Sequence, residues 1–299
     1  MTPAARTRVI SWGASILIAG AAGLSAQSYV PQRVYDSGAS QFSDFESMVA
    51  ALAKADVVFV GEQHDDPNTH RLERALLDGL ARRRGDIILS LEMFERDVQP
   101  RLTQFHRGAL PEVEFLASSR PWPRYATDYK PLVDLAVERK WPIVAANIPR
   151  PIASEISKGG LEVLRNKGET EMEWVAHDWD CPVGDEYYKR FEDVMRGHTS
   201  ASEMPLFYAA QCLKDETMAE SITKAWSAAA STIPGTRPLV VHYNGSFHSD
   251  YGLGTAARVK RRMPDIKTLV VTIIPTGNLD AIATVDHLRK GDYLVFTIK

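Results

Sequence analysis

Short runs of apolar residues recur along the chain without the polar alternation of a strand that faces solvent on one side. They are DVVFV (56–60), DIILSLEMF (86–94), WPIVAANIP (141–149), PLVVHYN (238–244) and KTLVVTIIP (267–275). Strands with this pattern are buried on both faces, as in a parallel sheet that is covered by helices. A sixth run, YLVFTI (293–298), predicts an edge strand.

Helical patterns follow these runs. After the first run, Asp66 is suited to be an N-cap, Pro67 fits the first helical position, and leucines recur at helical spacing from Leu72 to Leu80. Gly85 then predicts the stop of this helix.

A later helix is expected to begin at Ser249 or Asp250 and to end before Pro264. The alternation of strands and helices predicts an α/β fold with a mainly parallel sheet flanked by helices. Residues 97–140 and 151–235 contain helical patterns but no convincing strand. Since the second segment is far longer than a crossover needs, we expect a helical cap over the C-terminal edge of the strands.

The first 26 residues predict a secretory signal peptide that precedes a mature chain of residues 27–299. Arg6 and Arg8 give a positive start, and residues 9–24 are apolar and rich in Ala and Gly. The alternative, an uncleaved membrane anchor, would need a longer apolar stretch. Gln27 stands where a lipoprotein would carry its lipid-bearing cysteine, so no lipid anchor is expected.

Export to the periplasm or the exterior would place the two cysteines under oxidising conditions. Cys181 and Cys212 then either form a disulfide or remain two partly buried thiols, and their spacing matches no metal or redox motif. The sequence leaves both alternatives open.

The charge balance bears on the class of partner. With 35 basic and 38 acidic residues the formal net charge is −3, which argues against nucleic acid as a partner. The basic runs 82–84 and 260–262 each fall near the expected end of a helix, where they complement the helix dipole.

Polar side chains gather where the predicted strands end. In open α/β sheets, ligands bind beyond the carboxyl ends of the strands. The candidates at these ends are Glu62, His64, Glu92, Arg96, Asn147, Arg150, His242 and His248. Glu92 is the most informative, because a carboxylate at the end of a buried strand needs a partner or a function. Together these residues predict a functional cleft.

Neighbouring polar residues have simpler interpretations. Asp65, Asp66 and Asn68 are typical of a helix start. His70 falls within the first helical turn, where its expected role is to hydrogen-bond a carbonyl. Glu62 beside His64 alone would fit a self-satisfied polar turn equally well.

One chemistry that fits this cleft is metal-dependent hydrolysis of a peptide, amide or ester bond. Glu62, His64, Glu92 and His248 are a sufficient ligand set for a divalent metal with one open position for water. A spare carboxylate would act as general base, and Arg96 would stabilise developing negative charge.

The other chemistry is haem binding, in which Tyr or His ligates iron and Arg pairs with the propionates. The predicted cap is rich in aromatics over residues 119–132, 177–191 and 203–211, although most of these would also serve to pack the cap on the sheet. A third alternative is a binding module that holds a small acidic ligand.

Five stretches in order resemble the ChaN-type haem-binding uptake family. They are VVFVGEQHDDPNTHRLERALL, LSLEMFERDVQPRL, SSRPWPRYATDYKPLVDLA, PIVAANIPRPIA and VVHYNGSFHSDYGLGTAARV, within about residues 42–275. This family belongs to a superfamily with Tiki-type metal-dependent proteases, TraB-like proteins and erythromycin esterases. The superfamily's Gly-x-x-His element is matched by Gly61 to His64, its next-strand Glu by Glu92, and its late His by His248.

The resemblance implies a bacterial protein of iron acquisition that binds haem between the α/β core and the cap, as a homodimer with a Tyr ligand to iron. The candidate cofactor-binding residues are Tyr188, Tyr187 and Tyr129, in that order, with His198 as a helper and Arg150. The superfamily also leaves the metal-dependent hydrolase open as the second expectation, and haem binding without catalysis is preferred.

Overall fold

The structure is a computed structural model that describes residues 29–232 and 237–299. The predicted signal peptide lies outside the described residues. One mixed, mostly parallel sheet has the strand order β2-β1-β8-β7-β3-β6-β4-β5. Its strands are β1 (Gln32–Asp36), β2 (Gln41–Ser43), β3 (Val57–Glu62), β4 (Ile87–Glu95), β5 (Ile143–Asn147), β6 (Leu239–Gly245), β7 (Thr268–Thr276) and β8 (Tyr293–Ile298).

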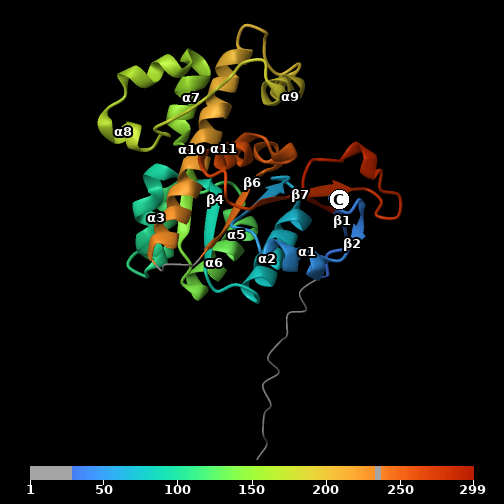
Figure 1. The fold of residues 1–299 in the computed structure, drawn as a ribbon. Helices are drawn as coiled ribbons and strands as arrows, with labels where there is room; N and C mark the ends of the chain where they lie inside the picture. Colours follow the sequence, from blue (N-terminus) through green and yellow to red (C-terminus); the bar gives the residue numbers. More distant parts are fainter. Residues whose placement is uncertain (1–28, 233–236) are drawn as a thin grey trace, which may run out of the picture.

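Helices cover both faces of this sheet (Figure 1). The helices of the described residues are α1 (Phe45–Leu52), α2 (Pro67–Ala81), α3 (Gln99–His106), α4 (Glu112–Ser119), α5 (Tyr125–Asp128), α6 (Lys130–Arg139), α7 (Arg150–Gly159), α8 (Glu169–Glu173), α9 (Glu186–Met195), α10 (Met204–Thr232) and α11 (Gly254–Arg262). The predicted α/β fold with a mainly parallel sheet is confirmed.

The five continuous apolar runs form the parallel core of the sheet, β3 to β7. On β3, Val58 and Val60 pack with α1, α2 and α6, whereas Val57 and Phe59 pack with α10 and α11. Since successive side chains of a strand point to opposite faces, a strand covered on both sides must be apolar at every position. This is why no polar alternation is seen.

The prediction of an edge strand at 293–298 is wrong. β8 pairs in parallel with β7 and in antiparallel with β1, so it lies inside the sheet. A hairpin of β1 and β2 extends the sheet beyond it. These two strands are short and mix apolar with polar residues, which gives them no continuous apolar run to recognise.

The start of α2 is as predicted. The Asp66 carboxylate accepts a hydrogen bond from the Thr69 backbone N–H at 2.7 Å, and Pro67 is the first helical residue. The later helix does not begin at Ser249 or Asp250, because both side chains bond elsewhere, to Asn244 and Thr272. Two short 3₁₀ turns, Ser246–His248 and Asp250–Gly252, precede α11 instead.

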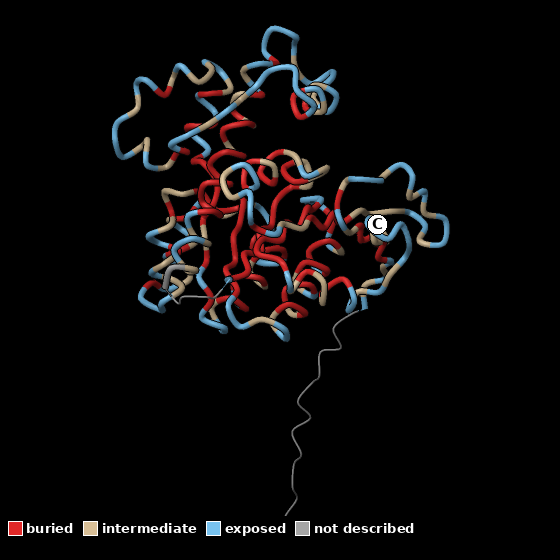
Figure 2. Tube along the Cα trace, in the orientation of Figure 1, coloured by how far each residue is buried: buried red, intermediate tan, exposed pale blue. Residues whose placement is uncertain are grey.

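The two segments predicted as a cap are placed differently. Residues 150–213, from α7 to the first part of α10, form a lobe above the sheet that we call the cap lobe (Figure 1). Phe247, in the 3₁₀ turn after β6, packs against the lobe's aromatic cluster. Helices α3 to α6, within 97–140, contribute Phe115 and Leu132 to the main core beside the sheet. Figure 2 shows buried residues concentrated around the sheet and an exposed outer side of the cap lobe.

Cys181 and Cys212 form a disulfide within the cap lobe, with Cα atoms 5.7 Å apart. This settles the alternative that the sequence left open. Across residues 29–232 and 237–299, no helix has the length and apolar character needed to cross a membrane.

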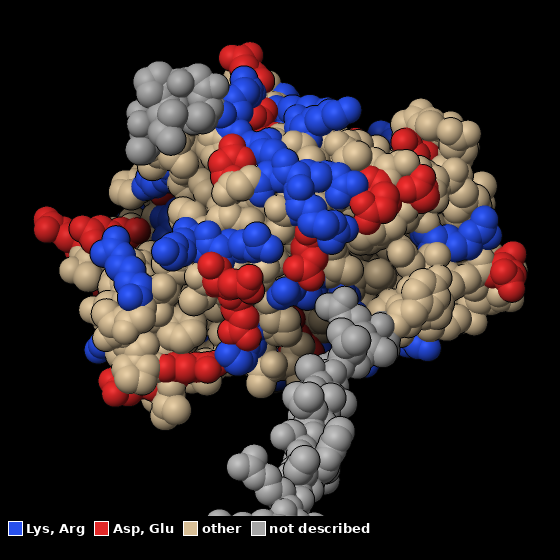
Figure 3. Space-filling view, turned by 90° about the horizontal axis from the view of Figure 1, so that it is seen from below, with Lys and Arg blue, Asp and Glu red and all other residues tan. Residues whose placement is uncertain are grey.

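The basic runs at the helix ends take part in ion pairs. Arg82 and Arg83 contact Glu46, and Arg84 contacts Asp86. Figure 3, which shows the molecule from below, has Lys and Arg side chains beside Asp and Glu side chains on this face. The basic groups near the end of α2 are therefore balanced by acidic neighbours.

Candidate functional site

The structure brings Glu62, His64, Glu92 and His248 together at the carboxyl ends of β3, β4 and β6. His64 Nδ1 lies 2.5 Å from Glu62 Oε1, and His248 Nε2 lies 3.3 Å from Glu92 Oε1. Both pairs border Gly245, whose backbone N–H donates to Glu92 Oε2 at 2.7 Å. A Cβ at Gly245 would lie 2.7 Å from His64 Nε2 and 3.7 Å from Glu92 Oε2, so only glycine allows this approach.

His248 is held between two buried carboxylates. Its Nε2 faces Glu92, and its Nδ1 lies 2.8 Å from Oδ1 of Asp215 on α10. Burial alone would favour the neutral ring, but the charges of Glu92 and Asp215 prevail and raise the pKa of His248 to about 10. His248 is therefore an imidazolium at neutral pH.

Glu92 is the anionic partner of this arrangement. Burial opposes its ionisation, but His248, His64 and the Gly245 N–H together hold its pKa far below the usual range. A buried charge is tolerated only when it is paired and hydrogen-bonded, and Glu92 meets both conditions.

His64 is the accessible member of the cleft. Its side chain is 47% exposed, whereas the Glu62 side chain is fully buried. Burial lowers the pKa of His64, but the hydrogen bond to Glu62 and the charge of Glu92 outweigh it, and the pKa is raised. The ring meets Trp122 edge-on with centroids 5.1 Å apart, so the loop before α5 borders the cleft.

The three tyrosine candidates occupy two different places. Tyr129 is buried in the main core, and its hydroxyl donates to Glu62 Oε1 at 2.8 Å. Tyr187 donates to Asp215 Oδ2 at 2.6 Å, while Tyr188 packs edge-on against Tyr208 in the cap lobe. The structure thus places Tyr129 and Tyr187 beside the carboxylates of the cleft.

Arg96 and Arg150 are paired with other acids, and His198 is exposed. Arg96 donates to the Thr217 carbonyl at 2.7 Å and pairs with Glu220, so its guanidinium is occupied on α10. Arg150 is 53% exposed and pairs with Glu95 at 2.8 Å. His198 is exposed in the loop between α9 and α10.

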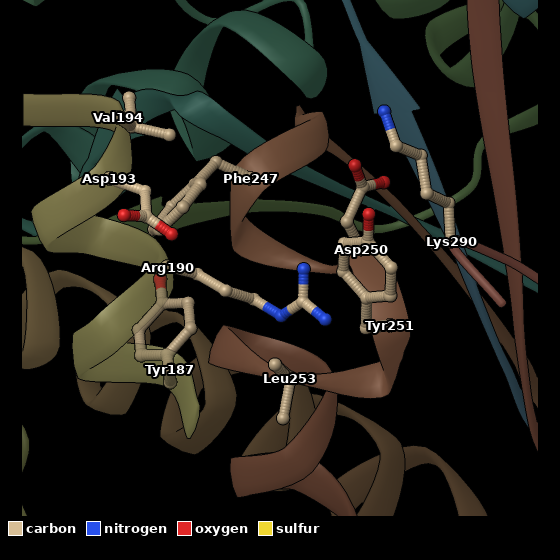
Figure 4. Close-up of a pocket in the computed structure, with 9 residues that line it drawn as sticks. All are labelled: Tyr187, Arg190, Asp193, Val194, Phe247, Asp250, Tyr251, Leu253 and Lys290. Atoms are coloured by element: carbon tan, nitrogen blue, oxygen red, sulfur yellow. The ribbon is translucent and has the colours of Figure 1, made fainter. Parts of the chain in front are cut away.

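A cavity of about 220 Å³ lies between α9 and the turns that follow β6 (Figure 4). Tyr187 is the one predicted site residue on its wall, and Phe247 and Tyr251 add aromatic surface. Asp250 also borders it, and burial raises the pKa of this carboxyl to about 6. The full lining is Tyr187, Arg190, Asp193, Val194, Phe247, Asp250, Tyr251, Leu253 and Lys290.

Asp215 was not among the residues predicted from the sequence, and His70 has a further contact beside the expected one. Asp215 contacts His248 and also accepts a hydrogen bond from Thr255 Oγ1 at 2.8 Å, but in the sequence it is one acid among several in a long helix. His70 does contact a carbonyl as expected, with Nε2 3.2 Å from His64 O, but its Nδ1 also lies 2.9 Å from Glu73. The spacing of His70 and Glu73, one helical turn apart, was the available signal.

These features define an α/β protein with a cleft of paired carboxylates and histidines at the strand ends, beneath a helical lobe. Residues 48–259 match the family described as haem-binding uptake, Tiki superfamily, ChaN, and the chain belongs to this family. The resemblance recognised in the sequence is thereby confirmed.

One solved structure supports this fold. The structure of cofacial heme binding to ChaN of Campylobacter jejuni is similar with a TM-score of 0.66 and 18% identity, over 90% of this chain and 97% of that one. Two weaker similarities have a TM-score of 0.41: RRSP, a MARTX toxin effector domain from Vibrio vulnificus (17% identity, 77% and 36% coverage), and the type III effector HopBA1 (12% identity, 92% and 100% coverage). No curated protein sequence matches the chain.

Proposed function

We propose that this protein binds haem and serves bacterial haem or iron uptake. Family membership supports this proposal, and so does the aromatic cluster of the cap lobe beside the cleft. Tyr187, Tyr188, Phe191 and Tyr208 form that cluster, and Phe247 packs against it from the end of β6. Flat aromatic surfaces of this kind suit a porphyrin.

Tyr188 is the iron ligand that the local chemistry favours. A tyrosine binds ferric iron as the phenolate, so a raised phenol pKa opposes ligation. Burial and nearby carboxylates raise the pKa of Tyr129, through Glu62, and of Tyr187, through Asp215. The hydroxyls of Tyr129 and Tyr187 also donate to those buried carboxylates. Burial and Glu192, on the same helix, raise the pKa of Tyr188 too, but the pKa of Tyr187 is raised further.

The haem is shared by two copies of the chain in this proposal. The cavity under α9, at about 220 Å³, is smaller than the roughly 300–1,000 Å³ of pockets that enclose a small-molecule ligand. Val183, Val194 and Phe207 are exposed apolar residues in the segments around α9 and the start of α10. An open apolar face would cover a porphyrin on one side only, so a second copy would cover the other. Arg150 remains the predicted partner of a propionate.

A hemin titration of the mature chain tests this function. We expect a saturable Soret shift, and a change of its ligand-dependent bands in Tyr188→Phe. Tyr208→Phe is the matched control, since Tyr208 is a buried member of the same cluster. The absence of a shift in the unmodified protein would refute haem binding, and a change only in Tyr187→Phe or Tyr129→Phe would refute the ligand assignment. Sedimentation with and without hemin tests the dimer.

Export of the chain is part of the proposal. The Cys181–Cys212 disulfide supports it, because such bonds persist in oxidising compartments and are rare in the cytosol. The N-terminal sequence of protein recovered from the periplasm or medium should begin near Gln27. Recovery of the uncleaved chain in the membrane fraction would favour an anchor instead.

A second candidate function is hydrolysis, favoured by the meeting of Glu62, His64, Glu92 and His248. His64 is accessible and paired with a carboxylate, as a general base would be, and His248 is a buried imidazolium that suits a general acid or an anion-stabilising group. Elemental analysis and a panel of peptide, amide and ester substrates test it. An activity that Glu92→Gln leaves unchanged would count against this cleft as its source.

A further inference from the structure

Glu62 directs its second carboxylate oxygen toward a buried cluster on α2. Glu62 Oε2 lies 3.6 Å from His70 Nδ1, and the same nitrogen lies 2.9 Å from Glu73 Oε2. The side chains of Glu62 and Glu73 are fully buried and that of His70 is 3% exposed. In the part of the chain that the structure describes, these three residues form a group with one ligand atom each, all within 4.8 Å of one another.

Both ring nitrogens of His70 face oxygen acceptors. His70 Nε2 faces the carbonyl oxygen of His64 at 3.2 Å and Asp128 Oδ2 at 3.4 Å. A carbonyl oxygen can only accept a hydrogen bond, so Nε2 carries the hydrogen. In the neutral ring Nδ1 then carries a lone pair that faces two carboxylates, which requires a cation between them, whereas in an imidazolium the Nδ1–H would donate to Glu73.

Two oxygens of the cluster are left without a hydrogen-bond partner among the described residues. They are Glu62 Oε2 and Glu73 Oε1, both buried. The other oxygen of Glu62 is held by Tyr129 at 2.8 Å and His64 at 2.5 Å, which orients Oε2 into the cluster. Buried acceptors converging on one point require a positive species between them, either a proton or a cation.

We propose that Glu62, His70 and Glu73 bind one divalent transition metal ion. An imidazole with two carboxylates is a donor set typical of Zn²⁺, and the single nitrogen distinguishes it from the all-oxygen sites of Ca²⁺ and Mg²⁺. Asp128, beside the far nitrogen of His70, supplies the carboxylate that commonly orients a metal-bound histidine. This site shares only Glu62 with the cleft predicted from the sequence.

The cluster lies beside a second cavity. His70 and Asp128 line a cavity of about 750 Å³ whose wall also includes Arg74, Asp78 and Arg124. Arg124 pairs with Asp128 at 2.8 Å, and Arg74 with Asp78 at 3.1 Å. Of the three proposed ligands, His70 borders this cavity, on the α2 side, whereas the side chains of Glu62 and Glu73 are fully buried behind it.

Zn²⁺ titration of the haem-free, metal-stripped mature chain tests the site by calorimetry and elemental analysis. We expect one Zn²⁺ per chain and no comparable binding of Mg²⁺. In Glu73→Gln the affinity should fall by more than the roughly 10–100-fold that loss of an outer-shell partner costs. Asp78→Asn is the matched control, because Asp78 lies on the same helix and cavity wall but outside the cluster.

A loss of Zn²⁺ binding counts only in a variant that still folds. Glutamine can donate to Glu62 as a protonated Glu73 would, so Glu73→Gln should fold, which circular dichroism and the Tm check. His70→Asn provides a second test. The proposal is overturned if no Zn²⁺ binds, since the cluster then holds a proton only. It is also overturned if binding survives in Glu73→Gln and is lost in Glu92→Gln, which would place the ion in the cleft.

Discussion

Asp215 Oδ1 lies 2.8 Å from His248 Nδ1, although the two residues come from α10 and from the turn after β6. Glu92 contacts the other nitrogen of the same ring at 3.3 Å. The imidazole thus bridges a carboxylate from the helical layer and one from the sheet. Because the pair joins two layers, its charge state affects the stability of the fold as well as the chemistry of the cleft.

Stability should therefore fall as the pH rises from about 6.5 to about 10. The folded-state pKa of His248, about 10, exceeds the ordinary value of 6.5, so protonation stabilises the fold fully below pH 6.5 and is lost as pH passes 10. The loss is on the order of a few kcal/mol, since one pKa unit is worth about 1.4 kcal/mol.

Urea unfolding at pH 6.5, 8 and 9.5 measures this effect. The variant His248→Gln should be less stable than the unmodified protein at pH 6.5, and its stability should change less with pH. Parallel profiles for the two proteins would show that His248 is not charged in the folded state.

Replacing Gly245 with Ala should alter His64 more than it alters the fold. The backbone at Gly245 (φ −53°, ψ 133°) suits any residue, but the new Cβ would come within 2.7 Å of His64 Nε2. The half-exposed ring can swing away from Glu92, which removes part of the charge that raises its pKa. We expect a lower His64 pKa by NMR and a change in unfolding free energy below about 1 kcal/mol. An unchanged pKa would contradict the close approach.

Removal of the disulfide should destabilise the chain by about 2–4 kcal/mol, mainly because the unfolded chain loses its cross-link. Cys181 and Cys212 are 31 residues apart in sequence, so the closed loop is substantial. The double variant Cys181→Ala/Cys212→Ala, compared by chemical unfolding, measures the effect. Addition of a reductant should lower the stability of the unmodified protein but not of the double variant. Equal sensitivity of both proteins would argue against a disulfide in solution.

Tyr129→Phe should reduce stability by about 1–3 kcal/mol, since Glu62 loses a buried hydrogen-bond donor. Its haem spectrum should match that of the unmodified protein, because Tyr129 is placed with Glu62 and not with the cap lobe. Thermal unfolding and a hemin titration of the same sample separate these effects. A lost Soret shift in a variant that is still folded would assign the iron ligand to Tyr129.

The pattern of apolar residues predicted those strands and helix ends that are determined by residues close together in the sequence. The strands β3 to β7 and the start of α2 at Pro67 follow directly from apolar runs and from the Asp66 cap. The meeting of Glu62, His64, Glu92 and His248 was also predictable, because carboxyl ends of parallel strands share one edge.

Other features depend on contacts between distant segments and left no local pattern. Asp215 faces His248 only because α10 packs against the turn after β6, and nothing near Asp215 marks it as special. Arg96 follows a strand end as a site residue would, but its guanidinium finds acceptors on α10. The β1–β2 hairpin is polar enough to be taken for a loop, which made β8 look like the edge.

Helix α10 runs unbroken for 29 residues, from Met204 to Thr232. Cys212 and Asp215 are three residues apart on it, so less than one turn separates the covalent tether of the cap lobe from the acid that contacts His248. Residues this close together in an unbroken helix move together. A tilt of the upper part of α10 would therefore move Asp215 relative to His248, to which its carboxylate is bonded.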